Sequence, residues 1–189
     1  LVAVADAGPF TQYVALSAWL PTFYSEVHNI SSIDSGIALG WVHFAGIFTL
    51  LASGFIALRV SRRRPFLIAP GLLISLAGLG SFALAGTVGM YPSLILLGIT
   101  SYFYLPVLLT IPIELPGATP EKISMVFASI VSIGGIFGFI APLTVGSLAD
   151  ISGSYIPGFC IFTLLASSLA IAGYLLPETG PSTKAKTQC

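Results

Sequence analysis

The stretch "LRVSRRRPF" (residues 58–66) decides how this chain is placed in a membrane. It holds four of the seven Lys and Arg residues of a 189-residue chain. Only 7% of the residues are charged and 56% are apolar, whereas soluble domains contain about 25% charged residues. Because so few charges cannot cover the surface of a soluble fold of this size, the sequence predicts an integral membrane protein.

Long apolar runs lie on both sides of this basic stretch. A run of about 20 residues can cross a bilayer as a helix. A β-barrel would need alternating apolar and polar residues, and runs such as "SLILLGIT" (residues 93–100) do not alternate. The sequence therefore predicts an all-α membrane protein with one domain over residues 1–189 and a polar cytoplasmic tail at 177–189. We expect six transmembrane helices, at residues 7–24, 36–58, 66–84, 91–113, 123–148 and 155–176.

The distribution of basic residues predicts the topology of these six spans. Alternate loops face alternate sides of the membrane. One side then receives all seven basic residues, from the loop at 59–64, the loop around Lys122 and the tail. Lys and Arg favour cytoplasmic loops, so both ends of the chain are expected in the cytoplasm. The membrane is expected to be the plasma, or inner, membrane.

Several classes of function have no support in the composition. The net charge is zero, which gives no reason to expect a nucleic-acid partner. Cys160 and Cys189 are too few for a disulfide framework or a metal site. No pattern of catalytic residues or phosphate-binding loop is present. We therefore expect neither an enzyme nor a bound cofactor or metal, although a six-span sensor, enzyme or assembly subunit stays the alternative to a transporter.

Six spans with both ends inside resemble one half of a major facilitator superfamily transporter. The basic stretch is similar to the family's loop pattern G-x-x-x-D-R-x-G-R-R. Gly54, Arg59, Arg62 and Arg63 fall at the pattern's spacing. Leu58 replaces its acid and Ser61 its second glycine. Further along, "GFIAPLTVGSLADISGSY" (residues 138–155) resembles the end of the family's eleventh helix, and "PETG" (residues 177–180) resembles the motif that closes the twelfth.

This resemblance implies the C-terminal half of a twelve-helix major facilitator fold. In that family two six-helix halves rock around a substrate near the bilayer midplane. The implied function is secondary active transport of a small solute by alternating access, with a proton as a candidate co-transported ion. The implied partners are the lipid bilayer and an N-terminal six-helix half. Within the family, "QYVALSAWLPTFYSE" (residues 12–26) is similar to a helix of cyanate and nitroimidazole-type transporters.

Polar and aromatic side chains inside the predicted spans are the candidates for substrate binding. A tyrosine hydroxyl is costly in lipid without a partner, so Tyr102 and Tyr104 are expected to face protein or a cavity. Pro106 is expected to break the helix beside them. The candidate substrate-binding residues are Gln12, Tyr13, Trp19, His43, Tyr102 and Tyr104.

Three of these candidates have an alternative structural interpretation. His43 is suited to binding or passing a proton, or it packs with its ring bonded to a carbonyl. Gln12 and Trp19 share a helical stripe with Leu16 and Phe23, which equally describes a packing face. Every Asp and Glu is expected at a span end or in a loop, so we expect no dense proton relay inside this half.

The basic stretch itself has two interpretations. It acts only as the topology signal, or it gates the cytoplasmic side as the family resemblance implies. A gate would pair the arginines with helix ends and with acids on the same side, for which Glu114, Glu121 and Glu178 are available. The candidate gating residues are Arg59, Arg62, Arg63 and Arg64.

Overall fold

The fold is that of a computed structural model, which describes residues 1–59 and 62–176. The described residues form helices joined by short connections, without a strand, so the prediction of an all-α fold is confirmed. The tail at 177–189, with the "PETG" motif and Glu178, lies outside the described residues. The helices are α1 (Val2–His28), α2 (Ser32–Arg59), α3 (Pro65–Ala83), α4 (Met90–Glu114), α5 (Pro120–Ser152), α6 (Ile156–Leu165) and α7 (Ser168–Leu175).

Local sequence signals explain where the longest helices begin and end. Ahead of α2, the Ser31 hydroxyl accepts a hydrogen bond from the Asp34 N–H at 3.1 Å and donates one to the Asp34 carboxylate at 2.7 Å. This reciprocal arrangement satisfies a backbone N–H group at the start of the helix. Thr119 precedes α5, and Pro120 occupies its first turn, where a missing N–H costs nothing. Gly153 ends α5 with a φ of 70°, which suits a residue without a side chain.

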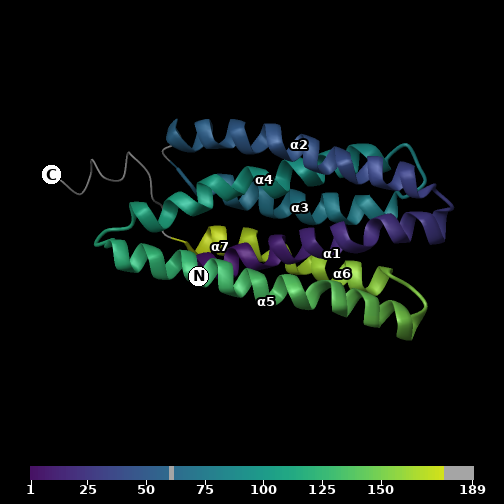
Figure 1. Cartoon of the computed structure of the whole chain (residues 1–189). Helices are drawn as coiled ribbons and strands as arrows, with labels where there is room; N and C mark the ends of the chain where they lie inside the picture. The colour runs from purple at the N-terminus through teal and green to yellow at the C-terminus, as the bar shows by residue number, and fades with distance from the viewer. Residues whose placement is uncertain (60–61, 177–189) are drawn as a thin grey trace.

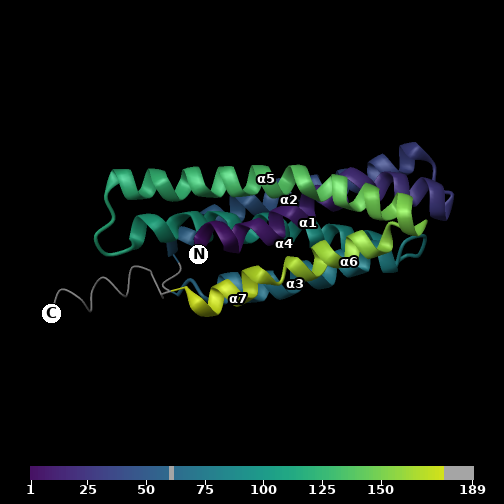
Figure 2. The same cartoon turned by 90° about the horizontal axis from the view of Figure 1, so that it is seen from below.

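The helices run alternately up and down the long axis of the molecule (Figure 1). The α1–α2, α3–α4 and α5–α6 connections lie at one end, and α2–α3 and α4–α5 lie at the other. Figure 2 shows the same alternation from a second direction. The basic residues of the described part, Arg59, Arg62, Arg63, Arg64 and Lys122, all belong to the α2–α3 and α4–α5 connections and their flanking turns.

Helix α1 lies at the centre of the bundle and contacts each of the other helices. In Figure 1, α2 borders one edge and α5 the other. Along α1, fully buried side chains such as Leu16, Leu20 and Phe23 pack into one apolar core. Val107, Leu108 and neighbouring residues of α4 belong to a second core nearer the basic end. The central position of α1 brings its polar side chains against its neighbours rather than against lipid.

Five described segments are long and apolar enough to cross a membrane, which indicates an integral membrane protein. They are α2, α3, α4, α5 and the combined segment Ile156–Leu175. The predicted first span, at residues 7–24, lies inside α1. This helix has 27 residues but falls short of the apolar character of the other five. Polar residues such as Asp6 and Gln12 lower its hydropathy, and both are buried inside the bundle.

The sixth predicted span, at 155–176, is interrupted. Helix α6 ends at Leu165 and α7 begins at Ser168. Between them the Ser167 N–H bonds to the Leu164 carbonyl, three residues back, so the turn is tighter than an α-helix. Gly8 of α1 lies directly against this break, where an added Cβ would come within 2.4 Å of the Leu165 carbonyl oxygen. Only a glycine on α1 permits this close approach.

Candidate functional site

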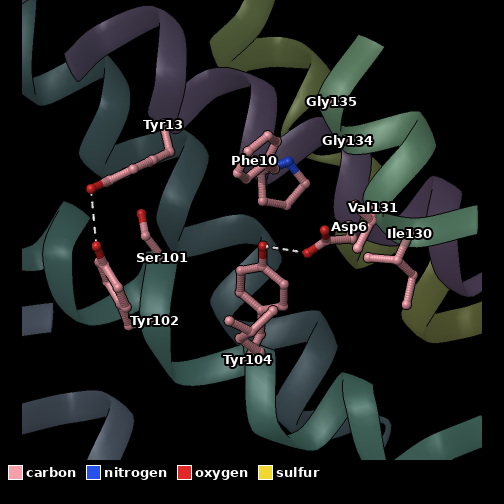
Figure 3. Close-up of a pocket in the computed structure, with 12 residues that line it drawn as sticks. Asp6, Phe10, Tyr13, Ser101, Tyr102, Tyr104, Ile130, Val131, Gly134 and Gly135 are labelled. Carbon is pink, nitrogen blue, oxygen red and sulfur yellow. Dashed lines mark hydrogen bonds between the residues drawn. The ribbon is translucent and has the colours of Figure 1, made fainter. Parts of the chain in front are cut away.

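A pocket of about 490 Å³ opens between α1, α4 and α5. Its polar and aromatic lining residues come from α1 and α4, while α5 contributes small and aliphatic residues, including Gly134 and Gly135 (Figure 3). The tyrosines on α4 lie near the middle of that helix, and the two glycines lie near the middle of α5. The pocket therefore sits at mid-height in the bundle. Its polar and aromatic lining residues are Asp6, Phe10, Tyr13, Ser101, Tyr102 and Tyr104.

Tyr13 joins two of the predicted residues into one hydrogen-bonded cluster. Its hydroxyl lies 2.7 Å from Nε2 of His43 and 2.9 Å from the hydroxyl of Tyr102. The three residues come from α1, α2 and α4, so the cluster ties three helices together. Gly46 of α2 makes room for the Tyr102 ring, because an added Cβ would lie 2.4 Å from a ring carbon. The sequence placed these residues in three different spans, and the fold brings them together.

The directions of these hydrogen bonds follow from the backbone around His43. Nδ1 of His43 lies 3.0 Å from the carbonyl of Leu39. A carbonyl only accepts, so Nδ1 carries the proton of the neutral ring and Nε2 is left as an acceptor. With the ring neutral, Tyr13 donates to His43 and Tyr102 donates to Tyr13. In this state both hydroxyl protons point toward the imidazole.

Asp6 and Tyr104 form a second polar pair in the pocket wall. The Tyr104 hydroxyl donates to Oδ1 of Asp6 at 2.9 Å (Figure 3). Both side chains are buried, with exposed fractions of 6% and 3%. Within the part of the chain that the structure describes, no other hydrogen bond reaches the carboxyl group of Asp6. Its second oxygen, Oδ2, is thus left to the pocket.

The expectation that every acid lies at a span end or in a loop is wrong for Asp6. The predicted first span began one residue after it, because the apolar run was counted from residue 7. Helix α1 begins at Val2, so Asp6 is part of the helix and bonds to the middle of α4. A sequence signal was available, since Asp6, Phe10 and Tyr13 follow i, i+4, i+7 spacing and share one helix face. All three line the pocket.

The expected helix break at Pro106 is also wrong. Helix α4 continues from Met90 to Glu114, with Pro106 and Pro112 inside it. Proline lacks the N–H that would bond to the carbonyl four residues back, which here is that of Tyr102. The packing of α4 against α2 and α3 on its sides holds the helix together despite this loss. The tyrosines are therefore presented by a continuous helix.

Gln12 and Trp19, predicted as substrate-binding residues, do not line the pocket. The fully buried Gln12 amide donates to the Ile74 carbonyl at 3.2 Å and to the Thr163 hydroxyl at 3.4 Å. Trp19 donates from its indole nitrogen to the Pro142 carbonyl at 2.8 Å. Both side chains tie α1 to neighbouring helices.

The basic stretch makes specific contacts at its end of the bundle. Arg63 is 3% exposed and forms an ion pair with Glu114 at the end of α4, with 2.6 Å between Nη2 and Oε1. A second bond of 3.2 Å joins its Nε to the other carboxylate oxygen. Nε of Arg64 donates to the carbonyl of Leu176, after α7, at 3.1 Å. The side chains of Arg59 and Arg62 are exposed. Arg63 and Arg64 therefore connect the α2–α3 turn to the ends of α4 and α7, and the gating role of the four arginines stays a prediction.

Two further observations bear on what the site can do. Among the described residues, no three His, Cys, Asp or Glu side chains are grouped as a metal ion would require. A second cavity of about 370 Å³ lies between α3 and α4, and none of its lining residues is ionisable. The α1–α4–α5 pocket is therefore the candidate site.

No protein-family model matches the chain, and a search of curated protein sequences finds no significant match.

Proposed function

We propose that this chain is a six-helix half of a secondary transporter of the major facilitator type, which moves a small solute by alternating access. The observation that carries the proposal is the pocket at mid-height in a bundle of apolar helices, with a carboxyl group in its wall. An ionisable group at membrane depth is costly and marks a functional site by default. The amino-acid pattern of the basic stretch supports the choice of family.

Helix α1 serves as the sixth span in this proposal. Its 27 residues extend over about 40 Å at 1.5 Å per residue, more than the ~30 Å of a hydrocarbon core. A helix covered by protein need not be uniformly apolar, and Thr11 and Gln12 of α1 are fully buried. With six spans, the basic end of the bundle is the cytoplasmic one.

The outer helices α2 and α5 leave a large apolar surface to be covered. Only 11% of the most apolar stretch of α5 and 22% of that of α2 is buried within the bundle. On α5 the exposed side chains include Val131, Phe139 and Leu143. The proposal requires that lipid and a second six-helix unit bury this apolar surface. A second unit would also close the open side of the pocket.

Alternating access is testable without knowing the substrate. Gly135 lines the pocket, and an added Cβ there would meet nothing within 4 Å. We would introduce Gly135→Cys in a Cys160→Ser, Cys189→Ser background, in cells that express the protein. A membrane-impermeant maleimide would be applied to intact cells and, separately, to inverted membrane vesicles. The proposal predicts labelling of this thiol from both sides, because the pocket opens to each side in turn.

Two positions at opposite ends of the bundle serve as controls for sidedness. Val88, 90% exposed between α3 and α4, should label only from outside when changed to cysteine. Glu121 in the first turn of α5, changed to cysteine, should label only from the cytoplasmic side. Labelling of the Gly135→Cys thiol from one side only, or from neither, would contradict alternating access at this pocket and favour a sensor or assembly subunit.

A further inference from the structure

We propose that the α1–α4–α5 pocket binds an organic cation with an aromatic or alkyl body, such as a quaternary or protonated amine. This inference rests on the proposed transport function, because it names the substrate class of the same site. It is carried by the charge of the pocket, by the directions of its hydrogen bonds and by its aromatic rings.

The pocket wall carries one acidic side chain and no basic one. Asp6 is the only ionisable carboxyl among the lining residues, and no Lys, Arg or His is among them. Oδ1 of Asp6 accepts from Tyr104, and Oδ2 has no hydrogen-bond partner among residues 1–59 and 62–176. His43 reaches the pocket only through Tyr13, and its ring accepts that bond. A bound protonated amine would donate a hydrogen bond to Oδ2, whereas a quaternary ammonium, which has no N–H, would be attracted to it by charge alone.

The tyrosine hydroxyls present acceptors, not donors, to the pocket. Tyr104 donates a hydrogen bond to Asp6. With the His43 ring neutral, Tyr102 donates to Tyr13 and Tyr13 donates to His43. Each hydroxyl oxygen keeps a lone pair, but each proton is already used within the wall. An anion needs donors, and these three groups offer none. A protonated amine needs acceptors, and a quaternary ammonium needs no donor. The hydrogen-bond polarity therefore selects for positive charge.

Ser101 is the exception in this polarity. Its hydroxyl oxygen is buried and has no hydrogen-bond partner in the described part of the chain. In Figure 3 it lies between the Tyr13–Tyr102 pair and the Asp6–Tyr104 pair. A buried hydroxyl without a partner is uncommon and costs stability. It can accept a bond from a ligand N–H as readily as it can donate one.

The body of the ligand is defined by the rest of the lining. Four rings, those of Phe10, Tyr13, Tyr102 and Tyr104, lie around the pocket. Aromatic faces attract cations, most strongly where water is excluded. The remaining wall is aliphatic or glycine, and the volume of about 490 Å³ lies within the range of small-molecule sites. The site thus suits a compact cation with apolar substituents.

The test compares two small probes of similar shape and opposite charge. Benzyltrimethylammonium and benzylsulfonate would be added separately to membranes carrying the Gly135→Cys thiol. The thiol would then be labelled with N-ethylmaleimide, which is uncharged. We expect benzyltrimethylammonium to slow labelling in a saturable manner and benzylsulfonate to leave the rate unchanged. The probe concentration that halves the labelling rate should rise at least about tenfold in Asp6→Asn, because a nearby charge is lost.

The Asp6→Asn change keeps the wall of the pocket intact, since an amide oxygen can still accept from Tyr104. The matched control is Asp150→Asn, which removes the same charge from an exposed position near the end of α5. If each variant is labelled, without any probe, at the same rate as the Gly135→Cys parent, the variant is folded. Equal protection by both probes, or protection by neither, overturns the inference about the ligand. The proposed transport function is tested separately, and it stands if the thiol is labelled from both sides of the membrane. Protection that survives in Asp6→Asn also overturns it.

Discussion

Gly98→Ala is expected to separate α2 from α4 and to break the Tyr13–His43 hydrogen bond. Gly98 of α4 lies against the backbone of α2, where an added Cβ would be 2.2 Å from the Val42 carbonyl oxygen. Ordinary contact begins at 3.4 Å. Because the obstacle is backbone rather than a flexible side chain, no rotamer change can relieve the clash. The two helices must move apart locally by about 1.2 Å, the difference between these distances.

This displacement has two measurable consequences. Overpacking of a close contact costs about 1–3 kcal/mol of stability. His43 follows Val42 on α2, and Tyr13 lies on α1. A movement of α2 by this amount would lengthen the 2.7 Å bond between them by up to about 1.2 Å, and the full extension exceeds hydrogen-bonding range. The free energy of unfolding would be measured in mixed micelles by titration with a denaturing detergent. The bond would be followed through the ring nitrogen chemical shifts of His43 in ¹⁵N NMR spectra.

Gly40→Ala provides the matched control on α2, since an added Cβ there would meet nothing within 4 Å. This change should leave the free energy of unfolding unaltered or raise it by up to about 1 kcal/mol, because alanine favours the helix over glycine. A Gly98→Ala protein as stable as the parent, with unchanged His43 shifts, would refute the close approach of α2 and α4 and the positioning role assigned to it.

Three further changes test other contacts. Tyr13→Phe removes two hydrogen bonds and should lower the free energy of unfolding by about 1–3 kcal/mol, measured in the same titration. The side chains of Arg63 and Glu114 are 3% and 17% exposed. Glu114→Gln weakens their ion pair and should lower the free energy of unfolding by at least about 1.5 kcal/mol in that assay. Tyr155 donates a hydrogen bond to the Glu26 carboxylate at 2.8 Å, and this bond raises the pKa of Tyr155 above its ordinary value. The folded protein therefore holds this proton more tightly, and the resulting stability is present below about pH 10 and lost as the pH rises through the folded-state pKa. Glu26→Gln should lower the pKa of Tyr155, as measured by tyrosinate absorbance.

Part of the candidate site could be predicted from the sequence because polar side chains inside apolar runs are conspicuous. Tyr13, Tyr102 and Tyr104 were identified in this way, and all three line the pocket. The same reasoning selected Gln12 and Trp19, whose polar groups bond to neighbouring helices instead. Sequence position shows that a polar group needs a partner, but the rotation of each helix determines which partner it meets.

The pairing of Asp6 with Tyr104 was missed for a related reason. The two residues are 98 positions apart in the chain, and no local pattern connects them. The apolar run that defined the first span excluded Asp6 by one position. A hydropathy score assumes that every side chain of a segment faces lipid. It therefore underestimates a spanning helix such as α1, whose polar side chains face other helices.

The sequence by itself determined the class of the protein, the positions of its helices and the clustering of its basic residues at one end. These features depend on length, hydropathy and turn residues, which act within a segment. Only the tertiary structure decided that α1 is central, that α6 and α7 are separate, and that Asp6, Tyr13, Tyr102 and Tyr104 share one pocket. Such features arise from close contacts between helices, at glycines such as Gly8 and Gly46, and a contact between distant segments is not encoded in either segment alone.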